Sequence, residues 1–123
     1  MPKVPTKSPD DAHLEDMLEA ARLIEDYMRG VSFADFWHNS EKRDAVALRL
    51  SVIGEAAVHI GLATQKALPS VPFKQIRGLR NRIAHDYGSI DFKVVWEVTQ
   101  SEIKPLITAL HIHLKKKKRT GSR

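Results

Sequence analysis

The feature that most constrains the fold is a spacing of three and four residues between apolar side chains along almost the whole chain. Its first stretch shows the pattern clearly, with apolar residues at Leu14, Met17, Leu18, Ala21, Ile24 and Met28. Such spacing puts the apolar side chains on one face of an α-helix. No stretch shows the strict alternation of a β-strand, and no segment repeats. The sequence therefore predicts an all-α protein.

Caps, prolines and glycines divide this pattern into four main helices. The expected bounds are Ser8-Pro9 to Gly30, Ser40 to about Ala63, Pro72 to Gly88, and Asp91 onward, with Pro105 kinking or restarting the last helix. Residues 32–37 form one short extra helical turn, whose Phe36 and Trp37 are expected to cover the core rather than stack on a ligand. Short connections predict an up-down four-helix bundle.

The expected second helix is apolar on more than one side, so it is either central or in contact with a second chain. Gly54 and Gly61 lie seven residues apart in it. Because glycine weakens a helix, the pair indicates close approach by another backbone, or is merely tolerated. Glu55 and His59, four apart, either pair with each other or support a site. We expect a homodimer, from this apolar surface and from the seam that Gly54 and Gly61 would form in it.

The charge of the chain is unevenly distributed. The 123 residues fit one domain, and the net charge is +5. Six basic residues fall in the last nine, which leaves fourteen basic and fifteen acidic residues in the rest. We expect a disordered segment over 1–8, a helical domain over 9–114 and a basic tail over 115–123. The tail either attracts polyanions or is only a solvated end.

Several classes of protein are excluded by composition. There is no cysteine, so disulfides and thiolate metal sites are absent. The apolar runs are shorter than the roughly 20 residues of a membrane span, and the first residues lack the apolar core of a secretory signal. His111 and His113 point to different sides of a helix and are expected at the surface, not on a metal. We expect a cytoplasmic protein with no membrane contact, no metal and no cofactor.

The stretch from Arg80 to Tyr87 concentrates the reactive side chains. Arg80 can bind phosphate through its planar guanidinium, His85 can exchange a proton near neutral pH, and Asn81 can orient either of them. This set suits cleavage of RNA without a metal, because the 2′-hydroxyl is a built-in nucleophile. Residues five apart on a helix point about 140° away from each other, so Arg80 and His85 need a distorted helix end or a shared cleft to meet.

A plainer interpretation of this stretch stays open. Arg80 and Arg82 would then be solvated, His85 would cap the helix end, and Tyr87 would pack. The side of the third helix opposite its apolar stripe carries Lys74, Arg77, Arg80 and Arg82, and we expect it to guide RNA.

The stretch resembles the R-x4-H-x-Y signature of the HepT-like family, within the HEPN superfamily of all-helical ribonucleases and nucleotide-associated domains. Three further stretches are similar to the family's helices: Ile53-Gly54-Glu55-Ala56-Ala57, Pro72 to Leu79, and His85 to Asp91 with Val95-Trp96. The resemblance covers roughly residues 10–112. It implies a homodimeric ribonuclease toxin of a type VII-like toxin–antitoxin system, with the Arg/His pairs lining the interface.

The resemblance also implies a role for each residue. Arg80 is the expected phosphate-binding residue, His85 the acid/base residue, and Asn81 their support. A nucleotidyltransferase antitoxin of the MntA type is expected to transfer AMP onto Tyr87 and so block RNA. The alternative is a catalytically inactive HEPN-fold module that binds a nucleotidyltransferase partner or a nucleotide, because a fold does not settle a function.

Overall fold

The computed structural model describes residues 9–121. Helices account for every regular element in that range, and it contains no strand. In chain order they are α1 (Pro9–Met28), α2 (Phe33–Trp37), α3 (Ser40–Val58), α4 (Leu62–Ala67), α5 (Phe73–His85), the 3₁₀ turn η1 (Tyr87–Ser89), α6 (Phe92–Ser101) and α7 (Ile103–Gly121). None of the described helices is long and apolar enough to cross a membrane.

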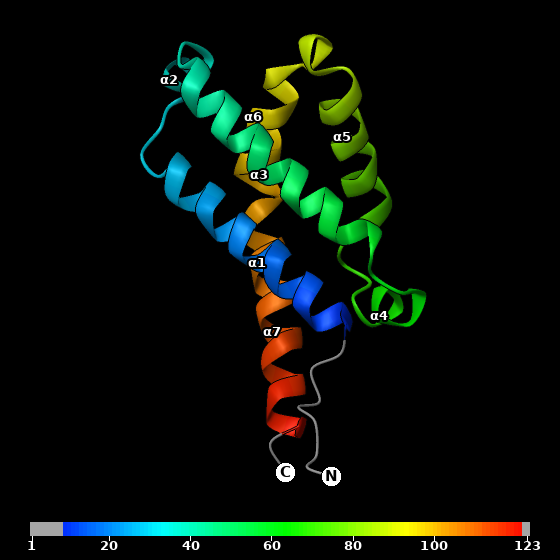
Figure 1. Ribbon diagram of the computed structural model, residues 1–123. Coiled ribbons are helices and arrows are strands. Elements are labelled where there is room, and N and C mark those ends of the chain that lie inside the picture. Colours follow the sequence, from blue (N-terminus) through cyan, green and yellow to red (C-terminus); the bar gives the residue numbers. More distant parts are fainter. Residues whose placement is uncertain (1–8, 122–123) are drawn as a thin grey trace.

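The main helices alternate in direction, which confirms the up-down bundle (Figure 1). Helix α3 runs back alongside α1 and has α5 on its other side, whereas α6 and α7 return behind them. Helix α7 packs on α1. The short extra helical turn expected over residues 32–37 is present as α2. Helix α3 is therefore central within one chain, which accounts for much of its broad apolar surface.

The core lies around α1, which packs on α3 and on α7. Leu14, Met17 and Ile24 of α1 and Leu110 of α7 have no exposed surface, and Ile53 of α3 is 2% exposed. Burying a side chain of this size stabilises the fold by about 1.5–3 kcal/mol. The apolar stripe predicted for α1 is thus confirmed as the face that meets the rest of the bundle.

Two predictions about α3 are wrong. Its N-cap is Asn39, whose side chain accepts a hydrogen bond from the backbone N–H of Lys42 at 3.0 Å, so Ser40 is already helical. The helix ends at Val58 rather than Ala63. Gly61 has extended backbone angles and is the N-cap residue that precedes α4, and the carboxylate of Asp10 accepts a hydrogen bond from its N–H at 3.3 Å. A tertiary contact to α1 thus sets where α4 starts.

Two other helix boundaries follow from proline and aspartate. Helices α6 and α7 are separated at Glu102, so Pro105 is the third residue of α7. Proline is tolerated there because the first turn needs no N–H donor, and the predicted restart is confirmed. Asp91 caps α6 as predicted and accepts a hydrogen bond from the N–H of Lys93 at 2.9 Å.

The predictions for the aromatic and histidine side chains are met only in part. Phe36 is fully buried, but Trp37 is 47% exposed and does not cover the core. His111 is at the surface as expected, whereas His113 is half-buried. His59 ends α3 and stacks on His13 of α1, with ring centroids 4.7 Å apart, so its predicted pairing with Glu55 is wrong.

Two predicted segments concern the ends of the chain. The backbone of α7 continues through the expected domain boundary at residue 114 as far as Gly121. The prediction for residues 1–8, including the expected cap at Ser8, lies outside the described residues, as do Ser122 and Arg123.

Candidate active site

Arg80 lies on the packed face of α5 rather than on its solvent side. It follows the buried Phe73 by seven residues, so the two side chains point within about 20° of each other. A Cβ at Gly54 of α3 would stand 2.1 Å from the Cβ of Arg80. Gly54 therefore makes room for Arg80, and the expected placement of Arg80 opposite the apolar stripe is wrong.

The close approach that Gly54 indicated is thus made by α5 of the same chain. The backbone oxygen of Ile76 would lie 3.2 Å from the same added Cβ. Gly61 is outside α3, so the two glycines do not form one seam. Neither glycine now supports contact with a second chain.

Two neighbours hold the guanidinium of Arg80. Its Nη2 forms an ion pair with Oε1 of Glu55 on α3. Its Nη1 donates a hydrogen bond to Oδ1 of Asn81 at 2.9 Å. The Arg80 side chain remains 27% exposed. The arginine is therefore held in one orientation while part of its surface still faces solvent.

His85 is the last residue of α5 and is exposed. It follows Asn81 by four residues, which places both side chains on one face of the helix. Among the residues that the structure describes, His85 has no side-chain hydrogen bond or ion pair. The structure does not bring Arg80 and His85 into contact. Asn81 lies between them, with the guanidinium turned towards it.

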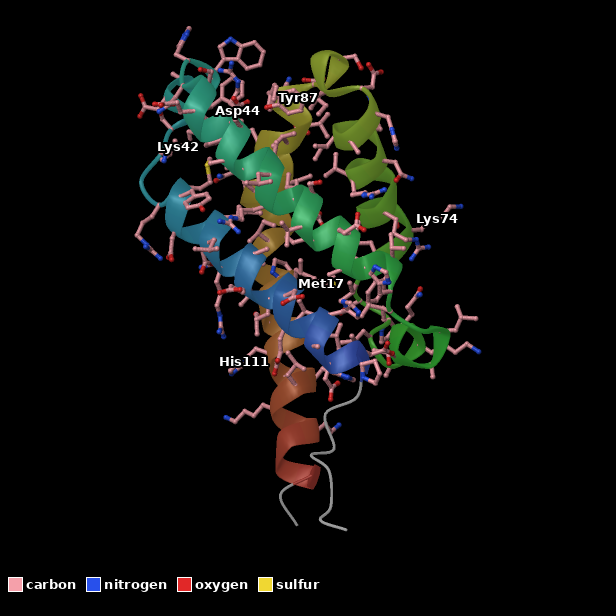
Figure 2. All side chains as sticks on the ribbon, in the orientation of Figure 1. Met17, Lys42, Asp44, Lys74, Tyr87 and His111 are labelled. Atoms are coloured by element: carbon pink, nitrogen blue, oxygen red, sulfur yellow. The ribbon has the colours of Figure 1, made fainter. Side chains whose placement is uncertain are left out.

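Tyr87 lies beyond the helix, in η1, and its hydroxyl donates a hydrogen bond to Oδ1 of Asp44 on α3. Figure 2 shows the two side chains together at one end of the bundle. The Tyr87 ring also meets Phe92 edge-on, with centroids 5.8 Å apart. Burial and the Asp44 carboxylate raise the pKa of Tyr87 to about 12, and Arg43 opposes them.

Asp44 is not among the site residues predicted from the sequence. It precedes Glu55 by eleven residues, so both carboxylates lie within about 20° of each other on α3. Because α5 runs antiparallel to α3, Asp44 meets Tyr87 near the end of α5 and Glu55 meets Arg80 near its middle. Two acidic residues eleven apart on an otherwise apolar helix could have indicated that both face the same neighbouring helix.

The expected RNA-guiding residues do not form one surface. Lys74 is exposed and points in about the same direction as His85, but it lies roughly 16 Å away along the helix axis. Figure 2 shows Lys74 far from Tyr87, pointing away from the bundle. Arg77 is half-buried. Arg82 points about 140° away from Arg77. Lys74 and Arg77 thus share the side of Asn81, and Arg82 does not.

Within residues 9–121, no three His, Asp or Glu side chains gather in a way that would hold a metal ion. What the site does contain is an oriented arginine, an exposed histidine on the same helix, and a phenol bound to a carboxylate. The arginine, the histidine and the phenol lie along α5 and the η1 turn that follows it, in an all-α bundle of the kind that the HEPN resemblance implies.

A comparison with known protein families identifies the family of this chain. The model of the family described as ribonuclease HepT-like matches residues 17–111. The chain belongs to the ribonuclease HepT-like family, and this membership places it among the ribonucleases.

Curated relatives cover most of the chain. It is 32% identical over 76% of its length to a protein of Thermococcus cleftensis named "Probable ribonuclease HepT", of which 86% is covered. It is 33% identical to a protein of Methanocaldococcus jannaschii named as a putative RNase, over 75% of this chain and 84% of the relative. No solved structure matches the chain significantly.

Proposed function

We propose that this protein is the toxin of a type VII-like toxin–antitoxin system and a metal-independent RNA endonuclease that acts in the cytoplasm. The observation that carries the proposal is the arrangement on α5. Arg80 is oriented by Glu55 and Asn81, and the exposed His85 lies one turn beyond Asn81. The family to which the chain belongs supports the same chemistry.

The proposed reaction uses the substrate's own nucleophile. The 2′-oxygen of RNA attacks the adjacent phosphorus, the bond from phosphorus to the 5′-oxygen breaks, and a 2′,3′-cyclic phosphate and a 5′-hydroxyl result. His85 exchanges the protons as acid or base. Arg80 offsets the negative charge that develops on the phosphate oxygens. Lys74, Arg77 and Arg82 are proposed to attract RNA without reading its sequence.

We also propose that two copies of the chain form the working enzyme. Leu48 of α3 is 58% exposed and Val58 is 49% exposed. Both lie within about 40° of Asp44 around the helix axis, so they flank the site residues of α3. A two-fold dimer through this surface would place two sets of Arg80 and His85 near each other.

An MntA-type nucleotidyltransferase is the proposed antitoxin, and AMP on Tyr87 is the proposed means of neutralisation. Tyr87 is 39% exposed, so a partner enzyme can reach it. Its position two residues beyond His85 would put the added phosphate and nucleoside beside the acid/base residue. Such a bulky anion would repel RNA by like charge.

The test is cleavage of a defined RNA by purified, unmodified protein. Wild type is expected to leave 2′,3′-cyclic phosphate ends, and Arg80→Ala and His85→Ala are each expected to lose at least about 100-fold of the rate. His111→Ala, at an exposed histidine on α7, is the matched control and should cleave normally. Equal cleavage by wild type and His85→Ala would refute the proposal.

One observation favours a second candidate. The carboxylate of Glu55 already pairs with the guanidinium of Arg80. A phosphate would therefore have to bind Arg80 beside Glu55 or displace Glu55 from it. A catalytically inactive HEPN-fold module that binds a nucleotidyltransferase partner or a nucleotide would be compatible with that ion pair. Wild-type protein that binds the partner but cleaves no RNA would identify this alternative.

A further inference from the structure

The hydrogen bond between Tyr87 and Asp44 joins two exposed residues from different helices. The Tyr87 hydroxyl is the donor, and Oδ1 of the Asp44 carboxylate is the acceptor. The ring of Tyr87 is also fixed from the side by Phe92. The phenol oxygen is therefore held beside a carboxylate while the residue remains open to solvent.

Any group transfer onto the phenol requires the loss of its proton. The pKa of Tyr87 is raised to about 12, with burial as the first cause and the Asp44 hydrogen bond as the second. Phenolate is already rare near neutral pH at the ordinary pKa of about 10, and the raised pKa makes it rarer, so the reaction begins from the neutral phenol. A base in contact with the hydroxyl then has to take the proton as the new bond forms.

We infer that Asp44 is the proton acceptor when Tyr87 is adenylylated, so that the toxin supplies part of the machinery of its own inactivation. The inference rests on the proposed modification of Tyr87. The phenol oxygen attacks the α-phosphorus of a nucleoside triphosphate and forms an O–P bond. The bond to the β-phosphate oxygen breaks, pyrophosphate leaves with the electron pair, and the phenol proton passes to Asp44.

General chemistry supports an aspartate in this position. In protein kinases an aspartate accepts the proton of the substrate hydroxyl during phosphoryl transfer. Here the acceptor would belong to the modified protein instead of the transferase. The guanidinium carbon of Arg43 lies 5.2 Å from the centroid of the Phe92 ring, which itself contacts Tyr87. The positive charge of Arg43 favours the phenolate form of Tyr87. The geometry thus provides an acceptor for the proton and positive charge near the developing anion.

A purely structural role for Asp44 makes a different prediction. If Asp44 only held the ring in place, asparagine would serve almost as well, because its Oδ1 also accepts a hydrogen bond. Asparagine cannot take the proton. Asp44→Asn therefore separates proton acceptance from positioning, and Asp44→Ala removes both. Asp16→Asn, at an exposed aspartate of α1, makes the same chemical change elsewhere and is the matched control.

The experiment follows AMP incorporation by intact mass. Each purified protein is incubated with ATP and with an MntA-type nucleotidyltransferase over a series of concentrations up to saturation, and Tyr87→Phe identifies the site. Asp44→Asn is expected to slow the initial rate about 100-fold, with no change in the half-saturating concentration of the transferase. Asp16→Asn should match wild type. Circular dichroism and thermal unfolding verify that each variant is folded.

The outcomes separate the inference from the proposal on which it rests. A wild-type rate in Asp44→Asn would overturn the role of Asp44 alone, as would a change confined to the half-saturating concentration. Absence of AMP on wild type would overturn the modification and, with it, the role of Asp44. RNA cleavage by the same preparations tests the ribonuclease activity independently of both.

Discussion

Two carboxylates of α3 hold the polar side chains of the site. Glu55 binds the guanidinium of Arg80, and Asp44 binds the hydroxyl of Tyr87. Each contact joins a residue of α3 to one in α5 or in the η1 turn after it, across the segment that contains α4. The chemistry of α5 and η1 therefore depends on side chains that lie 25 and 43 residues earlier in the chain. His85, by contrast, is exposed and makes no such contact with α3.

The ionisation of Tyr87 measures the Asp44 contact directly. In a Tyr27→Phe background only Tyr87 absorbs as a phenol, because the chain has two tyrosines. Its pKa is raised to about 12, so folding favours the neutral form and the associated stability is lost as the pH rises from about 10 to 12. Asp44→Asn should move the ultraviolet titration towards lower pH without reaching 10, since burial remains. An unchanged midpoint would argue against the hydrogen bond.

The packing of α5 on α3 is what orients Arg80. Helix α5 has its main contacts with α3 and with the η1 turn that follows it. Its buried side chains are Phe73 and Ile83, one at each end. Between them, the absence of a side chain at Gly54 lets the two helices approach at Arg80. The position of the arginine thus depends on a single glycine on the neighbouring helix.

Two glycine substitutions test this packing. Gly54→Ala should destabilise the protein by about 1–3 kcal/mol, because its Cβ would overlap Arg80 and push α5 away. Gly78→Ala, in α5 with nothing within 4 Å of the added Cβ, should instead stabilise it by up to about 1 kcal/mol. Urea unfolding measures both. A stabilising effect at Gly54 would show that the helices are not in close contact there.

The exposed apolar side chains of α3 bear on how whole molecules associate. Leu48 and Ile112 have the same exposed fraction, 58%, but Leu48 flanks the site and Ile112 lies on α7 next to His111, at the other end of the bundle in Figure 2. If the working enzyme is a dimer through α3, a charge at Leu48 would be buried without a partner. A charge at Ile112 would stay in solvent.

Light scattering at micromolar concentration distinguishes the two positions. Wild type and Ile112→Glu should be dimers, and Leu48→Glu should be a monomer with at least a tenfold lower rate of RNA cleavage. A monomeric wild type would contradict the proposed dimer. A dimeric Leu48→Glu would place the interface on another surface.

The sequence alone determined what depends on neighbours along the chain. The apolar spacing predicted helices, the bundle followed from their short connections, and the cap at Asp91 and the restart near Pro105 were correct because local hydrogen bonding decides them. Arg80, Asn81, His85 and Tyr87 were predicted as site residues from their chemistry and from the family signature, and their catalytic roles stay predictions. These properties need no knowledge of which helix packs on which.

Only the tertiary structure decided which residues hold one another. The end of α3, the placement of Arg80 against Gly54, and the partners Glu55 and Asp44 all arise from contacts between distant segments. Spacing along one helix specifies a face but not the neighbour that covers it. The same helix that was expected to meet a second chain through Gly54 meets its own α5 there, because packing partners are selected by the whole fold.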